Sequence, residues 1–270
     1  MPRSVLGLSR PMGSHRDARI AGAGRSSVGG QPGMMPARCR AVIRTLVSRV
    51  PGRFSSELGL NLPARRRRDL FLWFLAAILY GARISGATAA RTYAEFVRRG
   101  LTSPEQIVKT GWDGLVEALD AGGYVRYDFK TATKLLEVMT RLIDQYGGDL
   151  ETLHGAASDE RDVETRLKAL GKGIGEVTVQ IFLRELRGIW SKARPALSPL
   201  SILAARDLAL CSPVGRRTER PTVYLLHVLW KQAGMQAKSF SDFESALVRL
   251  GRDYCRRRRK RNCPMSEFCA

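Results

Sequence analysis

The sequence of 270 residues is poor in the residues that build disulfide frameworks and histidine-based metal or catalytic centres, with five Cys and three His. It also lacks a long hydrophobic segment, because its longest apolar run, residues 70–80, falls far short of the roughly 20 residues that span a bilayer. The N-terminus has no apolar segment of the kind found in secretion signals. We therefore expect no membrane association and a reducing, cytoplasmic compartment.

Acidic residues are scarce as well, since 25 Asp and Glu face 45 Lys and Arg, for a net charge of +20. Residues 1–54 hold ten Arg and a single acid, Asp17, and therefore nine of the excess positive charges. Ten further charges lie in two runs, 65–68 and 256–261. A localised basic surface on a near-neutral body favours a polyanionic partner such as nucleic acid, although a basic arm with solvated charge runs accounts for the composition equally well.

The first 36 residues contain seven Gly, four Pro and five Ser and show no apolar periodicity, which predicts a disordered basic arm. Their Arg- and Ser-rich composition over residues 1–33 also resembles an organelle-targeting peptide. Met34 and Met35 are alternative starts to Met1.

The rest of the chain predicts an all-α protein, because apolar residues recur at helical spacing and no sustained alternation of strand type occurs. Caps, prolines and glycines mark the helix ends; Ser103 before Pro104 is one such start. The expected helices are 37–50, 69–80, 87–99, 105–110, 112–119, 128–146, 163–170, 176–186, 199–210, 221–234 and 241–253.

The most informative segment is 167–186, in which one amphipathic helix ends in Gly171, Lys172, Gly173, Ile174 and Gly175 and a second helix begins at once. Glycines permit a tight turn that a ligand can approach closely, and the next helix points its unpaired amides outward. An ordinary helical corner with glycine caps would need only part of this pattern. The full pattern, L-x-x-L-G-x-G-I-G-x-x-T, favours a hairpin that binds the phosphate backbone of DNA without reading its sequence.

On this pattern the sequence resembles the helix-hairpin-helix DNA glycosylases related to endonuclease III and to the adenine glycosylase of mismatch repair. The resemblance covers about residues 71–269. Residues 69–85 are similar to the first core helix and the lesion-facing loop of that family, and residues 123–132 to its G-x-Y-x-x-K-A stretch with a short insertion. It implies a two-lobed all-α fold with a cysteine-rich C-terminal loop. Helix 37–55 would pack with the second lobe, 56–186 would form a six-helix lobe with the hairpin at 163–186, and 187–270 would form the second lobe.

The resemblance also locates the catalytic positions, and both have changed. The Asp that family members carry at the N-cap of the helix after the hairpin aligns with Ser198, which keeps the capping role but removes the negative charge. The Schiff-base Lys of lyase members aligns with Val177. If the protein is active, it is therefore a monofunctional glycosylase and not a lyase. Glu176 is the candidate replacement carboxylate, since Asp207 would face away from Ser198 on the same helix.

The resemblance assigns DNA contacts to three surfaces: the hairpin, the loop after the first core helix, and the basic run near the C-terminus. By the same resemblance Tyr124 would wedge into the duplex; a core aromatic is the equal alternative. The expected DNA-binding residues are Gly171, Lys172, Gly173, Gly175, Arg83, Tyr124, Arg256, Arg257, Arg258, Arg259, Lys260 and Arg261.

Three cysteines, Cys255, Cys263 and Cys269, end the chain with the spacing C-x7-C-x5-C. Family members commonly hold a [4Fe–4S] cluster with four cysteines here, so the resemblance implies such a cluster with one ligand missing. Cys211 or a residue other than cysteine would complete the ligand set. A zinc site or a loop without metal remains open at this point.

These observations predict a double-stranded-DNA-binding, nucleoid-associated monomer of base excision repair type that clamps the backbone and recognises damaged bases. The alternative is a non-catalytic homologue that marks or shields lesions. A redox-sensing or scaffolding module is the third interpretation, which salt-insensitive DNA affinity would favour. The sequence does not name a lesion, because pocket shape decides it.

Overall fold

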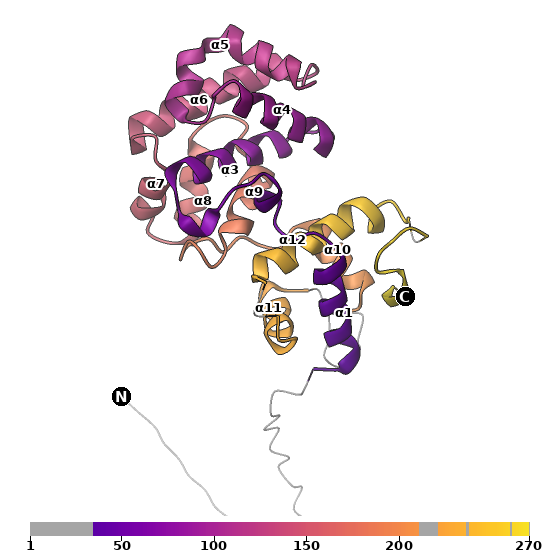
Figure 1. Cartoon of the computed structure of the whole chain (residues 1–270). Coiled ribbons are helices and arrows are strands. Elements are labelled where there is room, and N and C mark those ends of the chain that lie inside the picture. Colours follow the sequence, from indigo (N-terminus) through magenta and orange to yellow (C-terminus); the bar gives the residue numbers. More distant parts are fainter. Residues whose placement is uncertain (1–34, 211–220, 236–237, 260, 270) are drawn as a thin grey trace, which may run out of the picture. The chain divides into compact units, whose positions relative to one another are not determined.

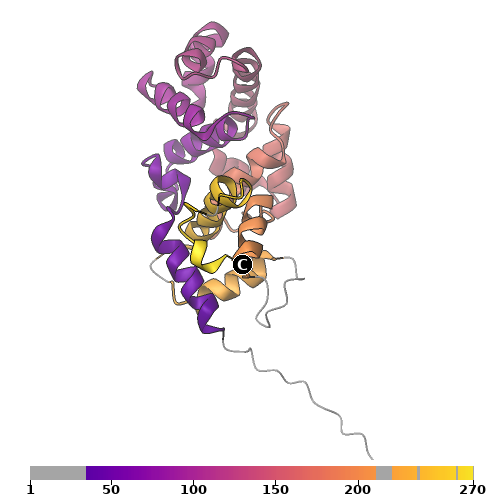
Figure 2. The ribbon, with the colours of Figure 1, turned by 90° about the vertical axis from the view of Figure 1, so that its right-hand side faces the viewer.

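The structure is a computed structural model that describes residues 35–210, 221–235, 238–259 and 261–269 (Figures 1 and 2). Every regular element in these segments is a helix, which confirms the all-α prediction. The α-helices are α1 Ala37–Arg49, α2 Phe54–Glu57, α3 Arg67–Tyr80, α4 Gly86–Arg98, α5 Pro104–Ala121, α6 Asp128–Tyr146, α7 Leu150–Ala156, α8 Glu160–Ala169, α9 Glu176–Leu186, α10 Pro199–Asp207, α11 Val223–Gln232 and α12 Phe240–Leu250.

Local sequence explains where most of these helices begin. Ser103 accepts a hydrogen bond from the Gln106 amide at the start of α5, and Ser239 forms a capping box with Asp242 at the start of α12. The two helices expected at 105–110 and 112–119 form one element, α5, which is kinked at Gly111 (φ 73°, ψ 177°). The sequence did not predict α7, which Asp149 caps through the Glu151 amide.

The buried side chains form two hydrophobic clusters. The first extends from Phe54 to Ala193, with Val248 added, and is centred on α3, where every residue from Asp69 to Leu79 is buried. The second joins α1 to α10, α11 and α12 and includes Cys263 and Met265. Figures 1 and 2 both show the indigo α1 beside the orange and yellow helices from the other end of the chain. None of the helices described here is long and apolar enough to cross a membrane.

A buried carboxylate connects the two clusters. Glu185 at the end of α9 is fully buried and accepts hydrogen bonds from the Phe54 and Ser55 amides (2.8 and 2.9 Å) and from the Ser245 hydroxyl (3.2 Å). Because α9 belongs to the hairpin and Ser245 lies on α12, these bonds fix the hairpin to the second cluster. Removing a partner from such a site leaves an uncompensated buried charge, which costs about 3–5 kcal/mol.

Candidate nucleic-acid interface

The hairpin joins α8 to α9 through residues 170–175. Ile174 is buried and lies between the two helices, as the sequence predicts. Its amide donates to the Gly171 carbonyl (3.2 Å), which closes the turn. A Cβ on Gly171 would lie 2.6 Å from Val138 Cγ2, so glycine is needed there for packing against α6.

Gly173 and Gly175 have different reasons to be glycine. Gly173 adopts φ +95°, a left-handed conformation that favours glycine. Gly175 is extended, and a Cβ there would meet nothing within 4 Å. No described residue accepts a hydrogen bond from the amides of these two glycines. The chain itself therefore leaves both the space and the donors around Gly175 open.

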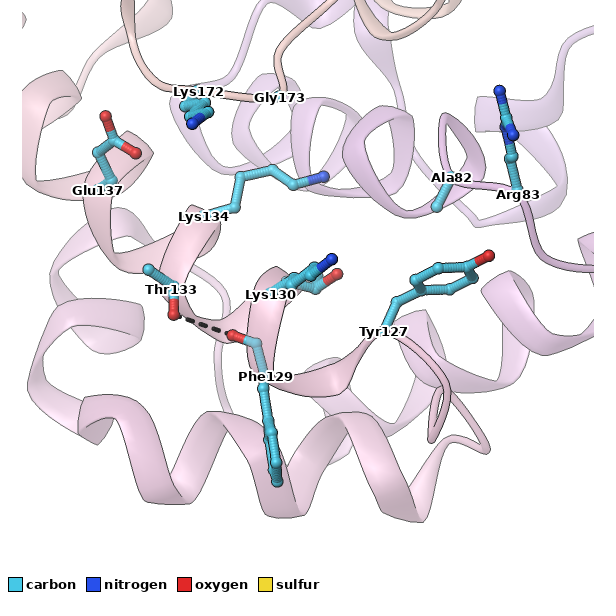
Figure 3. A pocket seen from close by; sticks show the side chains of 11 residues that line it. Ala82, Arg83, Tyr127, Phe129, Lys130, Thr133, Lys134, Glu137, Lys172 and Gly173 are labelled. Carbon is cyan, nitrogen blue, oxygen red and sulfur yellow. Dashed lines mark hydrogen bonds between the residues drawn. The ribbon is translucent and has the colours of Figure 1, made fainter.

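A pocket of about 820 Å³ lies beside the hairpin (Figure 3). We call it the cationic pocket. Its walls come from the loop after α3, from the start and first turns of α6, and from the hairpin. In Figure 3, Lys134 extends beneath Gly173 toward the loop that carries Arg83. The lining residues are Ala82, Arg83, Tyr127, Phe129, Lys130, Thr131, Thr133, Lys134, Glu137, Lys172 and Gly173.

The four cations of this pocket, Arg83, Lys130, Lys134 and Lys172, form no ion pair or hydrogen bond with any described residue. The acid of the pocket, Glu137, pairs with Arg141 at 3.0 Å. Burial lowers the pKa of Lys134, because an ammonium group loses solvation there without gaining a partner. Arg83, Lys172 and Gly173, which the sequence assigned to DNA binding from separate segments, thus line one site. Lys130 and Lys134 were missed because their spacing matches that of any helix surface.

The positions that align with the family's catalytic residues lie together in a second pocket, at the start of α9. Glu176, Val177 and Ser198 line a pocket of about 310 Å³ with residues 195–199 opposite α9. The Ser198 hydroxyl accepts from the Ser201 amide (3.0 Å) and contacts the Ser201 hydroxyl (2.8 Å), which is the capping role expected of it. Glu176 is 81% exposed and pairs with Lys168. Its carboxylate is therefore partnered at the rim of the pocket.

A further carboxylate in this pocket, Glu164 on α8, was not predicted. Burial raises the pKa of Glu164, Lys168, which pairs with it at 4.0 Å, lowers it, and Glu176 raises it. A carboxyl group whose pKa is raised by burial in a pocket is a candidate proton donor. Its sequence position, one turn before Lys168 on an exposed-looking helix face, gave no signal of this burial.

Tyr124 does not lie at the surface. It is 1% exposed within the first cluster, and burial raises its pKa to about 12. Gly123, with φ +84°, turns the chain so that Tyr124 faces the core while the next residue, Val125, is 65% exposed. Of the two alternatives for Tyr124, the structure has the core aromatic and not a surface wedge, and Val125 is an exposed apolar residue of this loop.

The basic run near the C-terminus divides between two pockets. Arg256 and Arg257 line a pocket of about 400 Å³ with Ser85 and Gly86 at the start of α4. Arg258 and Arg259 line the cysteine cavity described next, and Arg261 is exposed. Lys260 lies outside the described residues.

The cysteines expected to hold a cluster share one cavity of about 460 Å³. Cys255, Cys263 and Cys269 line it together with Asp207, which accordingly lies away from the Ser198 pocket. Burial raises the pKa of the Cys255 thiol, and its hydrogen bond with Asp207 raises it further. Cys211 lies outside the described residues. In the part of the chain that is described, no group of three or more His, Cys, Asp or Glu side chains is arranged to hold a metal ion.

No protein-family model and no curated protein matches this sequence. Among solved structures, the chain is similar to one described as a thermostable thymine-DNA glycosylase, with 17% sequence identity, coverage of 86% of this chain and 95% of that chain, and a TM-score of 0.48.

Proposed function

We propose that the protein binds the phosphate backbone of double-stranded DNA through the hairpin at residues 170–175, in the manner of a base excision repair protein. Three observations carry this proposal: the unpaired amides of Gly173 and Gly175, the open space beside Gly175, and the four unpaired cations of the pocket that Gly173 lines. A phosphate oxygen is a ligand to which unpaired amides and cations can donate hydrogen bonds together.

Such contacts hold the duplex in register without selecting a sequence. Val125, on the loop between α5 and α6, supplies an exposed apolar side chain of the kind that enters base steps and bends DNA. The hairpin would therefore position the duplex, and Val125 would distort it at sites where stacking is already weak.

The test is Gly175→Val, because this position is extended and has open space, so the variant folds. Its side chain occupies the volume that a phosphate would enter. We expect a loss of duplex affinity of about 10-fold or more, since charge-assisted hydrogen bonds to phosphate are lost. Gly155→Val is the matched control, since a Cβ there also meets nothing within 4 Å. Equal affinity of both variants would overturn the proposal.

We also propose, as a second candidate function, excision of a damaged base with Glu164 as proton donor. Its support is the half-buried Glu164 carboxyl group with a raised pKa, in the same pocket as Ser198. The alternative remains a non-catalytic protein that marks or shields lesions, since Ser198 has no charge to stabilise a cationic sugar.

Single-turnover incubation with duplexes that carry oxidised, alkylated, deaminated, mismatched or abasic sites separates the two. Alkali treatment and a denaturing gel reveal every excised base. A product that Glu164→Gln abolishes and Ser198→Ala leaves intact supports excision through Glu164. Binding without product across the whole panel supports the marking role.

A further inference from the structure

The cationic pocket concentrates positive charge that the protein itself does not neutralise. Its four cations come from three separate segments: Arg83 from the loop after α3, Lys130 and Lys134 from α6, and Lys172 from the hairpin. All four line a single hollow (Figure 3). Because Glu137 is paired with Arg141, the pocket keeps a positive potential throughout.

Lys134 is the member that most needs a partner. Its chain passes the hairpin so closely that a Cβ on Gly173 would lie 3.3 Å from its Cε and 3.8 Å from its Nζ. The ammonium group is thus held under the hairpin and is partly removed from water, with a lowered pKa. A bound anion would restore the solvation that Lys134 has lost.

The shape of the pocket selects among anions. The phosphates of a continuous duplex lie on a convex surface, which can rest against the hairpin but does not fill a hollow of about 820 Å³. A phosphate that enters a concave pocket needs a free end. Such a phosphate monoester carries a charge of about −1.5 to −2 at neutral pH, against −1 for an internal diester, and its attraction to the four cations grows in proportion.

We infer that the cationic pocket binds the dianionic phosphate of a monoester, with Lys134 and Lys130 as its principal partners. This chemistry has two sources: the terminal phosphate of a DNA strand at a nick, and a free nucleoside monophosphate. The first source rests on the proposed DNA binding, since the hairpin would hold the same strand. The second does not.

The experiment compares nicked duplexes that carry a 5′-phosphate or a 5′-hydroxyl at the nick, with an intact duplex of the same sequence as reference. We expect the full-length protein to bind the phosphorylated nick about 10-fold more tightly than the hydroxyl form, as an added charge-assisted contact implies. Lys134→Gln and Lys130→Gln should each reduce this ratio to below about 3-fold, and the ratio is read separately from any change in intact-duplex affinity. Lys238→Gln, an exposed lysine elsewhere, is the control.

A second arm of the experiment measures, by calorimetry and without DNA, the binding of adenosine monophosphate and of inorganic phosphate. If both compounds bind, and if Lys134→Gln abolishes this binding, the pocket is assigned to free phosphate monoesters as well as to strand ends. Binding to the phosphorylated nick alone assigns it to strand ends.

The pH dependence of the ratio identifies the charged form of the ligand. The second pKa of a phosphate monoester is about 6, so the preference for the 5′-phosphate should shrink as the pH falls from 7.5 to about 5.5. No group facing the pocket produces this loss, because the cations stay protonated on acidification and protonation of the one acid adds positive charge. These groups are Arg83, Lys130, Lys134, Lys172, Tyr127 and Glu137.

Three outcomes overturn the inference: equal affinity for the two nicked duplexes without nucleotide binding, a preference that survives Lys134→Gln, and a preference that does not change with pH. Intact-duplex binding without any terminal preference rejects the pocket but leaves the hairpin proposal standing. Nucleotide binding by a protein that binds no DNA supports the pocket and rejects the hairpin proposal.

Discussion

Two basic regions of this molecule carry the same formal charge and use it in opposite ways. The run 65–68 is conspicuous in the sequence, with four consecutive Arg. In the structure, Arg65 donates to Glu151 (3.0 Å) and Arg67 donates to Glu105 (2.6 Å) and to the Gly147 carbonyl (2.7 Å). The four cations of the cationic pocket are scattered through the sequence and have no such partners among the described residues.

The difference teaches that unpaired positive charge in the folded protein indicates a surface that binds nucleic acid. A high density of positive charge in the sequence does not. Arg65, just before α3, bonds to α7, and Arg67, the first residue of α3, bonds to the start of α5 and the end of α6. Glu151 also accepts a hydrogen bond from the Trp190 indole (2.6 Å). Their charge is largely neutralised within the fold. We therefore expect the run to contribute to stability and the pocket to contribute to binding.

The largest effect should come from Arg65→Ala combined with Arg67→Ala. Because both arginines are half exposed, losing these ion pairs should lower the free energy of unfolding by about 1–2 kcal/mol and the thermal midpoint by roughly 2–8 °C. Duplex affinity measured well below the midpoint should stay within about twofold. Calorimetry measures the thermal midpoint, and fluorescence anisotropy measures the duplex affinity. A double variant that folds but no longer binds DNA would show that the run 65–68 also contributes to binding.

The second effect is the converse. Arg83→Gln combined with Lys172→Gln should lower intact-duplex affinity by about tenfold and reduce the slope of affinity against salt by about two, since each cation that contacts a phosphate contributes close to one. The thermal midpoint should not fall, because neither side chain has a partner in the described chain. Duplex affinity measured over a range of salt concentrations tests this prediction. An unchanged slope would show that Arg83 and Lys172 do not contact the DNA phosphates.

A smaller effect is expected from the C-terminal basic run, which lies between the two extremes. Arg256→Gln with Arg257→Gln should weaken duplex binding severalfold, with a change in salt slope of at most about two. Both side chains are exposed beside the start of α4, and Asp253 nearby pairs with Arg252 at 2.8 Å. The same titration measures it; a loss larger than that of the Arg83 and Lys172 variant would make this run the principal contact.

The smallest effect concerns Lys134 and pH. Burial lowers its pKa in the folded chain, so the unfolded chain binds more protons as the pH approaches the ordinary lysine value. Lys134→Gln should therefore be more stable than the natural chain at pH 7, and this advantage should shrink as the pH rises toward 10. Urea denaturation at the two pH values tests the sign; an advantage that does not change with pH would show that Lys134 is well solvated in the folded chain.

The sequence predicts best what short segments decide alone. The hairpin follows from Gly171, Gly173 and Ile174, and the helix starts follow from serine caps. The sequence left Tyr124 open between a wedge and a core aromatic, because the burial of one side chain next to the left-handed Gly123 depends on how the whole lobe packs. Whether the cysteine loop carries a [4Fe–4S] cluster stays a prediction, which the iron and acid-labile sulfide content of the purified protein tests.

The cationic pocket and Glu164 were beyond the sequence for a different reason. Whether these side chains are buried and whether they are paired depends on how distant segments of the chain pack together. The spacing of residues in the sequence does not indicate that. Lys134 and Lys168 are both lysines on amphipathic helices. Lys168 pairs with Glu164 and Glu176, whereas Lys134 lies under the hairpin without a partner among the described residues.

The packing of α1 has a consequence for how the chain is made. Helix α1 leaves the ribosome first but packs against α11 and α12, which begin at Val223 and Phe240. At about 5–20 residues per second, α1 waits roughly 10–40 s for its partners, while residues 54–193 already have a complete cluster of their own. We expect this segment to become protease-resistant on arrested nascent chains before α1 does. The exposed apolar face of α1 in that interval makes it a natural client of chaperones during synthesis.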